Sequence, residues 1–458
     1  MVESPEKKPR QVGGWRKGSY QLASASHTHG GCLRSIERKL KQYMHLVVEI
    51  TSNKKIQYII INIITAAVVF ARNLIFMRKL ALIDLGQVAL AQTMIMFISL
   101  FQLGIINGGY RLYSSQNLEE NRKINNLISS FIFVIAIVFG TICLGLLGLI
   151  KSINFYFSTI TISLIAGLAT LGSNWYTNCL VADGRLRISN LINLLAAMSS
   201  LAIAASLWGR NLNVALLSLV AQPVLAMILT LIIYPVSRPT QFLLSSELLR
   251  RILSLGFIPF AGGILAILTV QIERWMIIYA LGPEQLGHYY IIILYTSVFT
   301  LVPASLLNVY YPTAMRRFET EDFLALSSIM KQHAKDLIRY IALAVLMTVF
   351  LIKPVVTMFL SKFKADTGLV FLGLPGFMAV AMCDVFSLHY HATRRLGPLL
   401  WQGLVGIFSL TGGLWILVAT KQFSLEHVVI VKSVAAMLTT GMIAALYFRE
   451  RHERRSQA

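Results

Sequence analysis

Two charged residues interrupt a run of apolar residues that is long enough to cross a membrane. Glu273 and Arg274 stand in the stretch QIERWMIIYALG, residues 271 to 282. A charged side chain at the centre of a bilayer costs about 2.5 to 3.5 kcal/mol on insertion scales, so such residues are kept where they serve a function. The pair therefore marks a candidate functional site at membrane depth.

A second arginine, Arg72, occupies a similar place early in the chain. Asn62, Thr65 and Arg72 are spaced so that they lie near one face of a helix, and Gln271 and Arg274, three residues apart, share a face in the same way. This spacing predicts that the polar side chains gather on one face of each helix. The candidate site residues are Arg72, Arg274, Asn62, Thr65 and Gln271. The alternative is that both arginines extend from helix ends to the membrane interface.

Three further in-span charges, Glu273, Asp384 and Lys432, are candidates for charge partners or for coupling to an ion. The expected arrangement is an ion pair between Asp384 and Lys432. A coupling-ion site at Asp384 is the alternative. Glu273 is expected to neutralise a neighbouring cation or to orient Arg274, rather than to carry a proton.

Cofactor and metal chemistry have no sequence signal. The four cysteines form neither a disulfide framework nor a zinc spacing, and the pair His389 and His391 is too sparse to predict a metal site. No phosphate-binding loop and no nucleophile motif is found. We therefore expect a protein that is not an enzyme, with no cofactor and no resident metal.

The composition identifies the elements that must position these residues. Of 458 residues, 56% are hydrophobic and 13% are charged, against about 25% charged in soluble domains. Segments of about 20 apolar residues are long enough to span a bilayer as helices. The predicted spans are 56–78, 86–110, 126–150, 155–180, 188–208, 214–236, 256–281, 286–311, 338–360, 368–391, 397–419 and 425–448. The expected fold class is an all-α polytopic membrane protein with about twelve transmembrane helices.

The net charge of +21 is distributed unevenly between alternate loops. With a cytoplasmic amino terminus, 30 Lys and Arg fall on the cytoplasmic side, 7 on the outer side and 4 within spans. This asymmetry predicts that both termini are cytoplasmic, and it makes nucleic acid an unlikely partner for the basic residues. The first 43 residues contain no secretory signal. Met1 and Met44 are both candidate starts of translation.

The two halves of the chain resemble each other at an offset near 200 residues. Arg72 aligns with Arg274, and Leu85-Gly86 aligns with Leu286-Gly287. Six spans separate equivalent elements, so the halves are expected to be related by an axis along the membrane normal. Pro259 with Gly262-Gly263 predicts a kinked or broken seventh helix. The predicted domains are a basic tail 1–55, bundles 56–236 and 256–448, a cytoplasmic linker 237–255 with an amphipathic helix, and a second tail 449–458.

A family resemblance rests on these short motifs. Glu273-Arg274 followed by Leu286-Gly287-His288-Tyr289, with Arg72, Leu85-Gly86 and Gly104, Gly108 and Gly109 in the first half, resembles the Wzx-like polysaccharide flippases. These belong to the multidrug/oligosaccharidyl-lipid/polysaccharide (MOP) exporter superfamily, whose fold is two six-helix bundles. The resemblance covers residues 56 to 448. The chain departs from the family pattern with Glu273 in place of the usual Asp. Its twelve spans differ from the fourteen typical of lipid II flippases.

The resemblance implies a function, a location and a site. The implied site is a hydrated cationic cavity in which Arg72 and Arg274 face each other and bind the diphosphate of the substrate, with Asn62, Thr65 and Gln271 lining it. Such a protein flips a polyprenyl-diphosphate-linked oligosaccharide across the bacterial cytoplasmic membrane by alternating access, for synthesis of surface polysaccharide such as O-antigen. The implied partners are the lipid-linked oligosaccharide, membrane lipids and polysaccharide assembly proteins, and a monomer is expected. A cation-coupled small-molecule or drug exporter of the same superfamily is the main alternative. A membrane polysaccharide polymerase or ligase is disfavoured, because no predicted outer loop exceeds about a dozen residues.

Overall fold

The computed structural model describes residues 54–114, 118–149, 156–206, 211–393, 395 and 397–457. The predicted amino-terminal tail up to residue 53, with Met44, lies outside this part of the chain, and so does Lys151. The described residues are helical with short turns, and they include twelve helices long and apolar enough to cross a membrane. The expected all-α polytopic fold with twelve spans is thereby confirmed.

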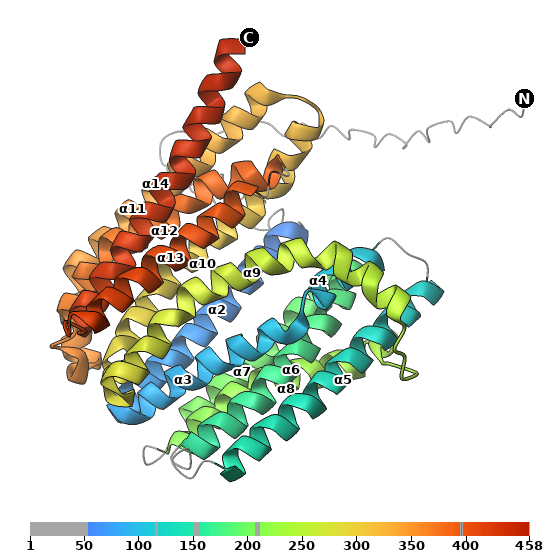
Figure 1. Ribbon diagram of the computed structural model, residues 1–458, viewed down its shortest axis with the longest axis horizontal. Helices are drawn as coiled ribbons and strands as arrows, with labels where there is room; N and C mark the ends of the chain where they lie inside the picture. Colours follow the sequence, from blue (N-terminus) through green and yellow to red (C-terminus); the bar gives the residue numbers. More distant parts are fainter. Residues whose placement is uncertain are drawn as a thin grey trace, which may run out of the picture. The chain divides into compact units, whose positions relative to one another are not determined.

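The first half of the chain forms helices α2 to α8, which we call the first bundle. Their bounds are α2 Lys54–Lys79, α3 Leu82–Ser99, α4 Ile105–Tyr113, α5 Leu118–Leu149, α6 Phe157–Ala182, α7 Leu186–Ala205 and α8 Leu212–Ile233. Helix α6 packs against α3 and α8, and α8 packs in turn against α7. Figure 1 shows α5, α6, α7 and α8 running side by side in this group.

The second half forms helices α9 to α14, which we call the second bundle. Their bounds are α9 Ser246–Leu281, α10 Pro283–Glu319, α11 Phe323–Phe359, α12 Thr367–Ala392, α13 Gly397–Ala419 and α14 Leu425–Gln457. Helix α12 packs against α10, α11 and α14, and α13 packs against α9 and α14 (Figure 1). Helix α14 continues to Gln457, so the residues predicted as a carboxy-terminal tail are helical up to that point.

The second predicted span is interrupted. A short 3-10 turn, η1 Leu100–Gln102, separates α3 from α4, and Leu103 and Gly104 both have left-handed backbone, with φ of 50° and 84°. Glycine adopts this conformation at little cost. A side chain at Gly104 would also lie 2.8 Å from the carbonyl oxygen of Gly256 in α9. The expected continuous helix over 86–110 is therefore wrong, because the chain bends to bring α4 against α9.

The repeat motif Leu-Gly lies where the two bundles meet. A Cβ added at Gly86 in α3 would lie 1.8 Å from the carbonyl oxygen of Pro283, the first residue of α10. A Cβ added at Gly287 in α10 would lie 2.0 Å from the carbonyl oxygen of Leu82, the first residue of α3. The two contacts mirror each other. We call this close crossing of α3 and α10 the glycine seam.

The connection between the halves is bound to the first bundle by hydrogen bonds. Asn125 Nδ2 in α5 donates to the carbonyl of Ser237 at 3.0 Å, and Asn125 Oδ1 accepts from Trp175 Nε1 at 2.8 Å. Asn126 Oδ1 accepts from the backbone N–H of Thr240 at 2.9 Å. The residues after η3 Pro235–Ser237 therefore follow α5 closely, because buried amides satisfy the backbone of the connection.

Helix α9 extends from the connection through the seventh span without a break. The predicted amphipathic linker helix and the predicted span are one helix of 36 residues, which bends in Figure 1 but is not broken at Pro259 or Gly262. The amino-terminal part of α9 packs on α4: a Cβ at Gly108 would lie 2.0 Å from the carbonyl oxygen of Ile252. Its carboxy-terminal part packs on α13 and α10. The two ends of this helix therefore belong to different bundles.

Candidate functional site

Arg72 lies buried in the first bundle and is held by neutral partners. It is 6% exposed, and its Nη1 donates to Ser200 Oγ in α7 at 2.9 Å and to Gln222 Oε1 in α8 at 3.1 Å. Its Nε has no hydrogen-bond partner in the part of the chain that the structure describes. The guanidinium therefore keeps a spare donor and is not neutralised by these hydrogen bonds. A bound anion would accept a hydrogen bond from this spare donor and would neutralise the guanidinium.

Arg274 lies in the second bundle, and its guanidinium also keeps an unused hydrogen-bond donor. It is 8% exposed, and no described residue forms a hydrogen bond with its buried Nε. The phenol of Tyr290 in α10 interacts electrostatically with both Arg72 and Arg274. Gln92 Nε2 in α3 donates to the same phenol oxygen at 3.0 Å. These four residues, Arg72, Gln92, Arg274 and Tyr290, form what we call the seam cluster, with two residues from each bundle.

The other predicted cavity residues are placed unevenly. Gln271 is 1% exposed, and its Nε2 contacts Met96 Sδ of α3 at 2.8 Å while its Oε1 has no partner. Gln271 therefore lies between the bundles, one turn from Arg274. Asn62 and Thr65 are half-buried on the amino-terminal part of α2. Thr65 Oγ1 donates to the Ile61 carbonyl at 2.8 Å within its own helix, and neither residue joins the hydrogen bonds recorded for Arg72.

The ion pair in the second bundle differs from the expected one. Lys432 Nζ in α14 contacts Glu273 Oε1 in α9 at 2.5 Å and Tyr289 hydroxyl at 3.4 Å. The Glu273 side chain is fully buried and that of Lys432 is 17% exposed. The expected pair of Asp384 with Lys432 is therefore wrong. Glu273 also attracts Arg274, so one carboxylate faces two cations and one positive charge is in excess.

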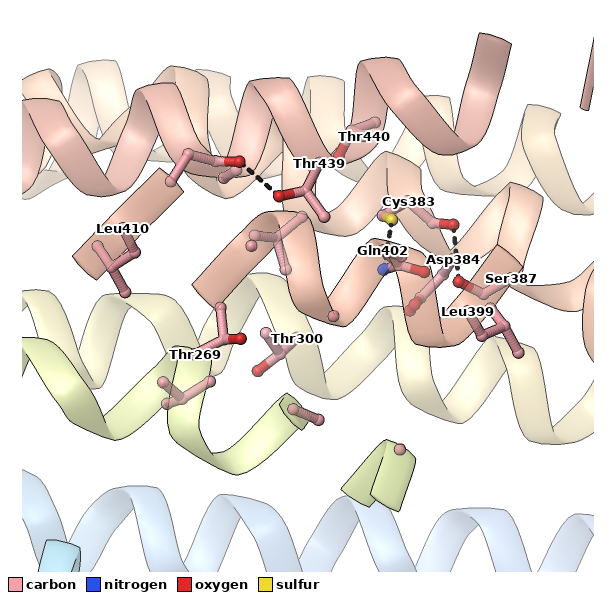
Figure 2. A pocket seen from close by; sticks show the side chains of 18 of the residues that line it. Thr269, Thr300, Cys383, Asp384, Ser387, Leu399, Gln402, Leu410, Thr439 and Thr440 are labelled. Atoms are coloured by element: carbon pink, nitrogen blue, oxygen red, sulfur yellow. Dashed lines mark hydrogen bonds between the residues drawn. The ribbon is translucent and has the colours of Figure 1, made fainter. Parts of the chain in front are cut away.

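Asp384 instead lines a cavity inside the second bundle. The cavity has a volume of about 640 Å³ and is lined by residues of α9, α10, α12, α13 and α14. Figure 2 shows Asp384 beside Gln402 at one part of the lining, with Thr269 and Thr300 farther along it. Lys432 also lines this space. We call it the second-bundle cavity, and it is separate from the seam cluster.

Several residues of the site were not predicted from the sequence. Ser200, Gln222 and Gln92 are neutral residues on apolar spans, and each contacts the seam cluster or belongs to it. Tyr290 also belongs to the site and is fully buried. The sequence signal for these residues was a polar side chain in an apolar span. Such a side chain must find a hydrogen-bond partner when it is buried, because burial without one is costly. That signal does not say which residues meet.

Comparison with known proteins establishes the fold. No family model matches the chain, and no curated protein matches it. A structure of an inward-facing multidrug resistance MATE family transporter of the MOP superfamily aligns with a TM-score of 0.72 at 12% identity, over 87% of this chain and 99% of that one. The lipid II flippase MurJ, in an inward closed conformation, aligns with a TM-score of 0.68 at 13% identity, over 85% and 86%.

An outward-facing MATE family structure aligns less well. Its TM-score is 0.54 at 14% identity, over 88% of this chain and 95% of that one. At such low identity these likenesses show the fold alone. The chain therefore has the two-bundle fold seen in MOP superfamily transporters.

Proposed function

We propose that this protein flips a polyprenyl-diphosphate-linked oligosaccharide across the bacterial cytoplasmic membrane by alternating access. The observation that carries the proposal is the seam cluster, in which Arg72 and Arg274 each retain a buried donor without a partner among the described residues. Their hydrogen-bond partners are neutral or absent. Two guanidinium groups with unused donors suit the oxygens of a diphosphate, which accept several charge-assisted hydrogen bonds.

The charge arrangement supports an anionic substrate over a cationic one at the seam. Glu273 is paired with Lys432 at 2.5 Å and also attracts Arg274, so one carboxylate is shared between two cations. A buried charge without a counter-ion is unfavourable, and a bound diphosphate would supply that counter-ion. The fold likeness to the lipid II flippase MurJ is consistent with a lipid-linked substrate.

Alternating access accounts for why the cluster contains residues of both bundles. In the described conformation the seam cluster is buried and α3 crosses α10 at the glycine seam. Separation of the bundles would expose both arginines to one side of the membrane, and their approach would cover them again. The proposal places both termini and the basic loops in the cytoplasm, with the chain acting as a monomer alongside membrane lipids and polysaccharide assembly proteins.

The test is transport by the purified chain in proteoliposomes. The substrate is a fluorescent sugar linked to polyprenyl diphosphate, and a membrane-impermeant reagent measures how much of it reaches the outer leaflet. Arg274→Ala is expected to reduce flipping at least tenfold, and Arg274→Lys is expected to keep part of the activity because it retains the charge without the fork. Equal flipping by wild type and Arg274→Ala, at equal protein content, would contradict the role of Arg274.

A further inference from the structure

A groove runs along α6 in the first bundle, between α5 and α8. Helix α6 forms its floor, α5 and α8 form its walls, and residues 239–242 of the connection between the bundles line one end. Its volume is about 680 Å³, and sites for small molecules range over about 300 to 1,000 Å³. We call it the α6 groove. It is large enough to hold part of an organic ligand.

The α6 groove faces away from α3, the helix that contacts the second bundle. Gly167 of α6 faces α3, because a Cβ added there would lie 2.7 Å from Ile98 Cβ. Each residue of a helix is turned by about 100°, so Ile165 and Ala169 point the opposite way, and both line the groove. Ile165 is 49% exposed, and Phe133 on the α5 wall is 58% exposed. In a bilayer the groove therefore opens to the lipid.

The end of the groove next to the connection is polar. Ser129 and Ser130 of α5 line it. Ser130 Oγ accepts from the Leu243 N–H at 2.9 Å, and Ser129 Oγ accepts from the Tyr176 hydroxyl at 3.2 Å. Neither serine donates its own hydrogen to another residue of the described chain. Each therefore keeps one O–H to donate to a ligand that accepts hydrogen bonds, such as an ester carbonyl.

A cation lies at the same end of the groove. Arg238 is exposed and precedes Pro239, the first lining residue of the connection. Its Nε donates to the Leu231 carbonyl at 2.7 Å, and Leu231 follows Met227 of the α8 wall by one turn. This hydrogen bond holds the guanidinium near the polar end and leaves its terminal nitrogens for an anion. A phosphate accepts such charge-assisted hydrogen bonds.

The charges around this end favour an anionic ligand. The lining of the groove and residues 237–245 contain no Asp or Glu. The start of α5 carries four charges that cancel one another: Glu119, Glu120, Arg122 and Lys123. A cationic headgroup such as choline would therefore find no carboxylate in the lining or the connection, whereas a phosphate would find Arg238.

The polar and apolar parts of the groove follow the order of a phospholipid. Tyr176 lies at the polar end, and Ile165 lies about 16 Å farther along α6, at about 1.5 Å per residue. The α6 residues that line the groove between them are apolar or glycine. We propose that the α6 groove binds one anionic glycerophospholipid, with its phosphate at Arg238, its ester carbonyls at Ser129 and Ser130, and an acyl chain along α6.

The ester carbonyls distinguish this ligand from the substrate proposed above. A polyprenyl diphosphate has phosphate oxygens and an apolar tail but no ester carbonyl, so it would leave the hydrogens of Ser129 and Ser130 unused. The assignment does not depend on flipping at the seam cluster. The bound lipid contacts both α6 and residues 239–242, so it would help to hold the connection against the first bundle.

The test is native mass spectrometry of the purified full-length chain, titrated in detergent with three lipids. The lipids are phosphatidylglycerol, phosphatidylcholine with the same acyl chains, and a polyprenyl phosphate. Wild type is expected to retain one phosphatidylglycerol about fivefold more tightly than either of the others, because one arginine attracts the anionic headgroup. Equal affinities for the two phospholipids would overturn the proposal. Tighter or equal binding of the polyprenyl phosphate would assign the groove to the substrate tail and also overturn it.

Two variants locate the lipid. Arg238→Gln is expected to remove the preference for phosphatidylglycerol, and Arg78→Gln, an exposed arginine at the end of α2, is the control that keeps it. Ala169→Phe fills the groove and is expected to weaken both phospholipids about tenfold, because the acyl chain loses buried contact. Ala202→Phe, at an exposed alanine of α7, is its control. A preference that survives Arg238→Gln, or full binding by Ala169→Phe, would place the lipid elsewhere and overturn the assignment.

Discussion

Glu273 stands out among the buried residues because its charge is matched by a residue far away in the sequence. Its side chain is fully buried and contacts Lys432, which is 159 positions later in the chain. Glu273 Oε2 has no hydrogen-bond partner. A buried pair of this kind contributes little net stability as a pair, but removal of one partner leaves an uncompensated charge. The pair therefore ties α9 to α14 beside Arg274.

The pair predicts a rescue. Glu273→Gln is expected to destabilise the protein by about 3 kcal/mol, because Lys432 then keeps a buried charge without a counter-ion. The double variant Glu273→Gln with Lys432→Met is expected to recover most of that loss. The measurement is thermal unfolding of the purified variants in detergent, together with their abundance in membranes.

The deciding comparison is between the stability of Glu273→Gln and the stability of the double variant. A double variant as unstable as the sum of the two single variants would show that Glu273 and Lys432 do not interact energetically. The variant Glu426→Gln, at the exposed start of α14, serves as a control that changes a charge outside the pair.

The sequence predicted which residues carry charge in the membrane but not how they pair. Asp384 and Glu273 are both acidic residues in apolar spans, and nothing in their spacing from Lys432 selects between them. The choice depends on how α9, α12 and α14 are rotated about their axes. Hydropathy does not encode that rotation, because each of these helices is apolar on most of its surface.

At the scale of elements, the connection between the bundles is held against α5 by hydrogen bonds and is not a free linker. Asn125 and Asn126 of α5 bind the backbone at Ser237 and Thr240, and Ser130 Oγ accepts from the Leu243 N–H at 2.9 Å. Trp175 completes the arrangement by donating to Asn125. A run of short polar residues on one helix thus orders a segment that lacks helical hydrogen bonds of its own.

Substitution of Asn125 tests this docking. Asn125→Ala removes the acceptor of the buried Trp175 N–H and the donor to Ser237, so we expect a loss of about 1 to 3 kcal/mol in the free energy of unfolding. We also expect faster protease cleavage between residues 238 and 245. Limited proteolysis and thermal unfolding are the measurements. Gln241→Ala, an exposed change in the same segment, is expected to leave both unchanged.

The elements themselves were largely predictable from hydropathy, with an instructive exception. Apolar segments of spanning length gave twelve helices at nearly the predicted positions. The break after η1 was not predicted, although Gly104 was noted as part of a run of small residues. Its cause is the close approach of Gly256 from the other half of the chain. A contact across about 150 residues leaves no periodic signal in either segment.

At the scale of the whole molecule, the glycine seam brings the starts of α3 and α10, one from each bundle, into contact. Gly86 and Gly287 have equivalent positions in the repeat, and each faces the first residue of the helix opposite. The repeat was readable from the sequence, but the reason for its glycines was not. They permit two helix starts to cross with backbone against backbone.

A methyl group at the glycine seam should push α3 and α10 apart. Gly86→Ala places a Cβ where the Pro283 oxygen lies 1.8 Å away, so we expect the ends of α3 and α10 to separate and transport to fall. Spin labels at positions 83 and 284, in a background without the four native cysteines, would report a longer distance. Gly441→Ala, where a Cβ meets no atom within 4 Å, is the control. An unchanged distance in Gly86→Ala would contradict the seam.

The topology is a separate prediction for the whole chain. The excess of Lys and Arg in alternate loops predicts a cytoplasmic carboxy terminus and an outward loop at Lys151. Reporter fusions after Ala458 and after Lys151 are expected to report opposite sides of the membrane. The same side for both would be incompatible with the predicted orientation of twelve spans.

The arrangement of α9 determines how force passes from one bundle to the other. Its amino-terminal part is fixed to α4 at Ile252, its carboxy-terminal part carries Glu273 and Arg274, and the helix between them is continuous. The covalent connection between the bundles therefore runs through a continuous helix that is packed within the fold, and not through a flexible loop. Any rotation of one bundle against the other must bend or twist α9. The elastic strain of switching would then gather in the stretch around Gly262 and Gly263, where an added Cβ meets no neighbouring atom within 4 Å.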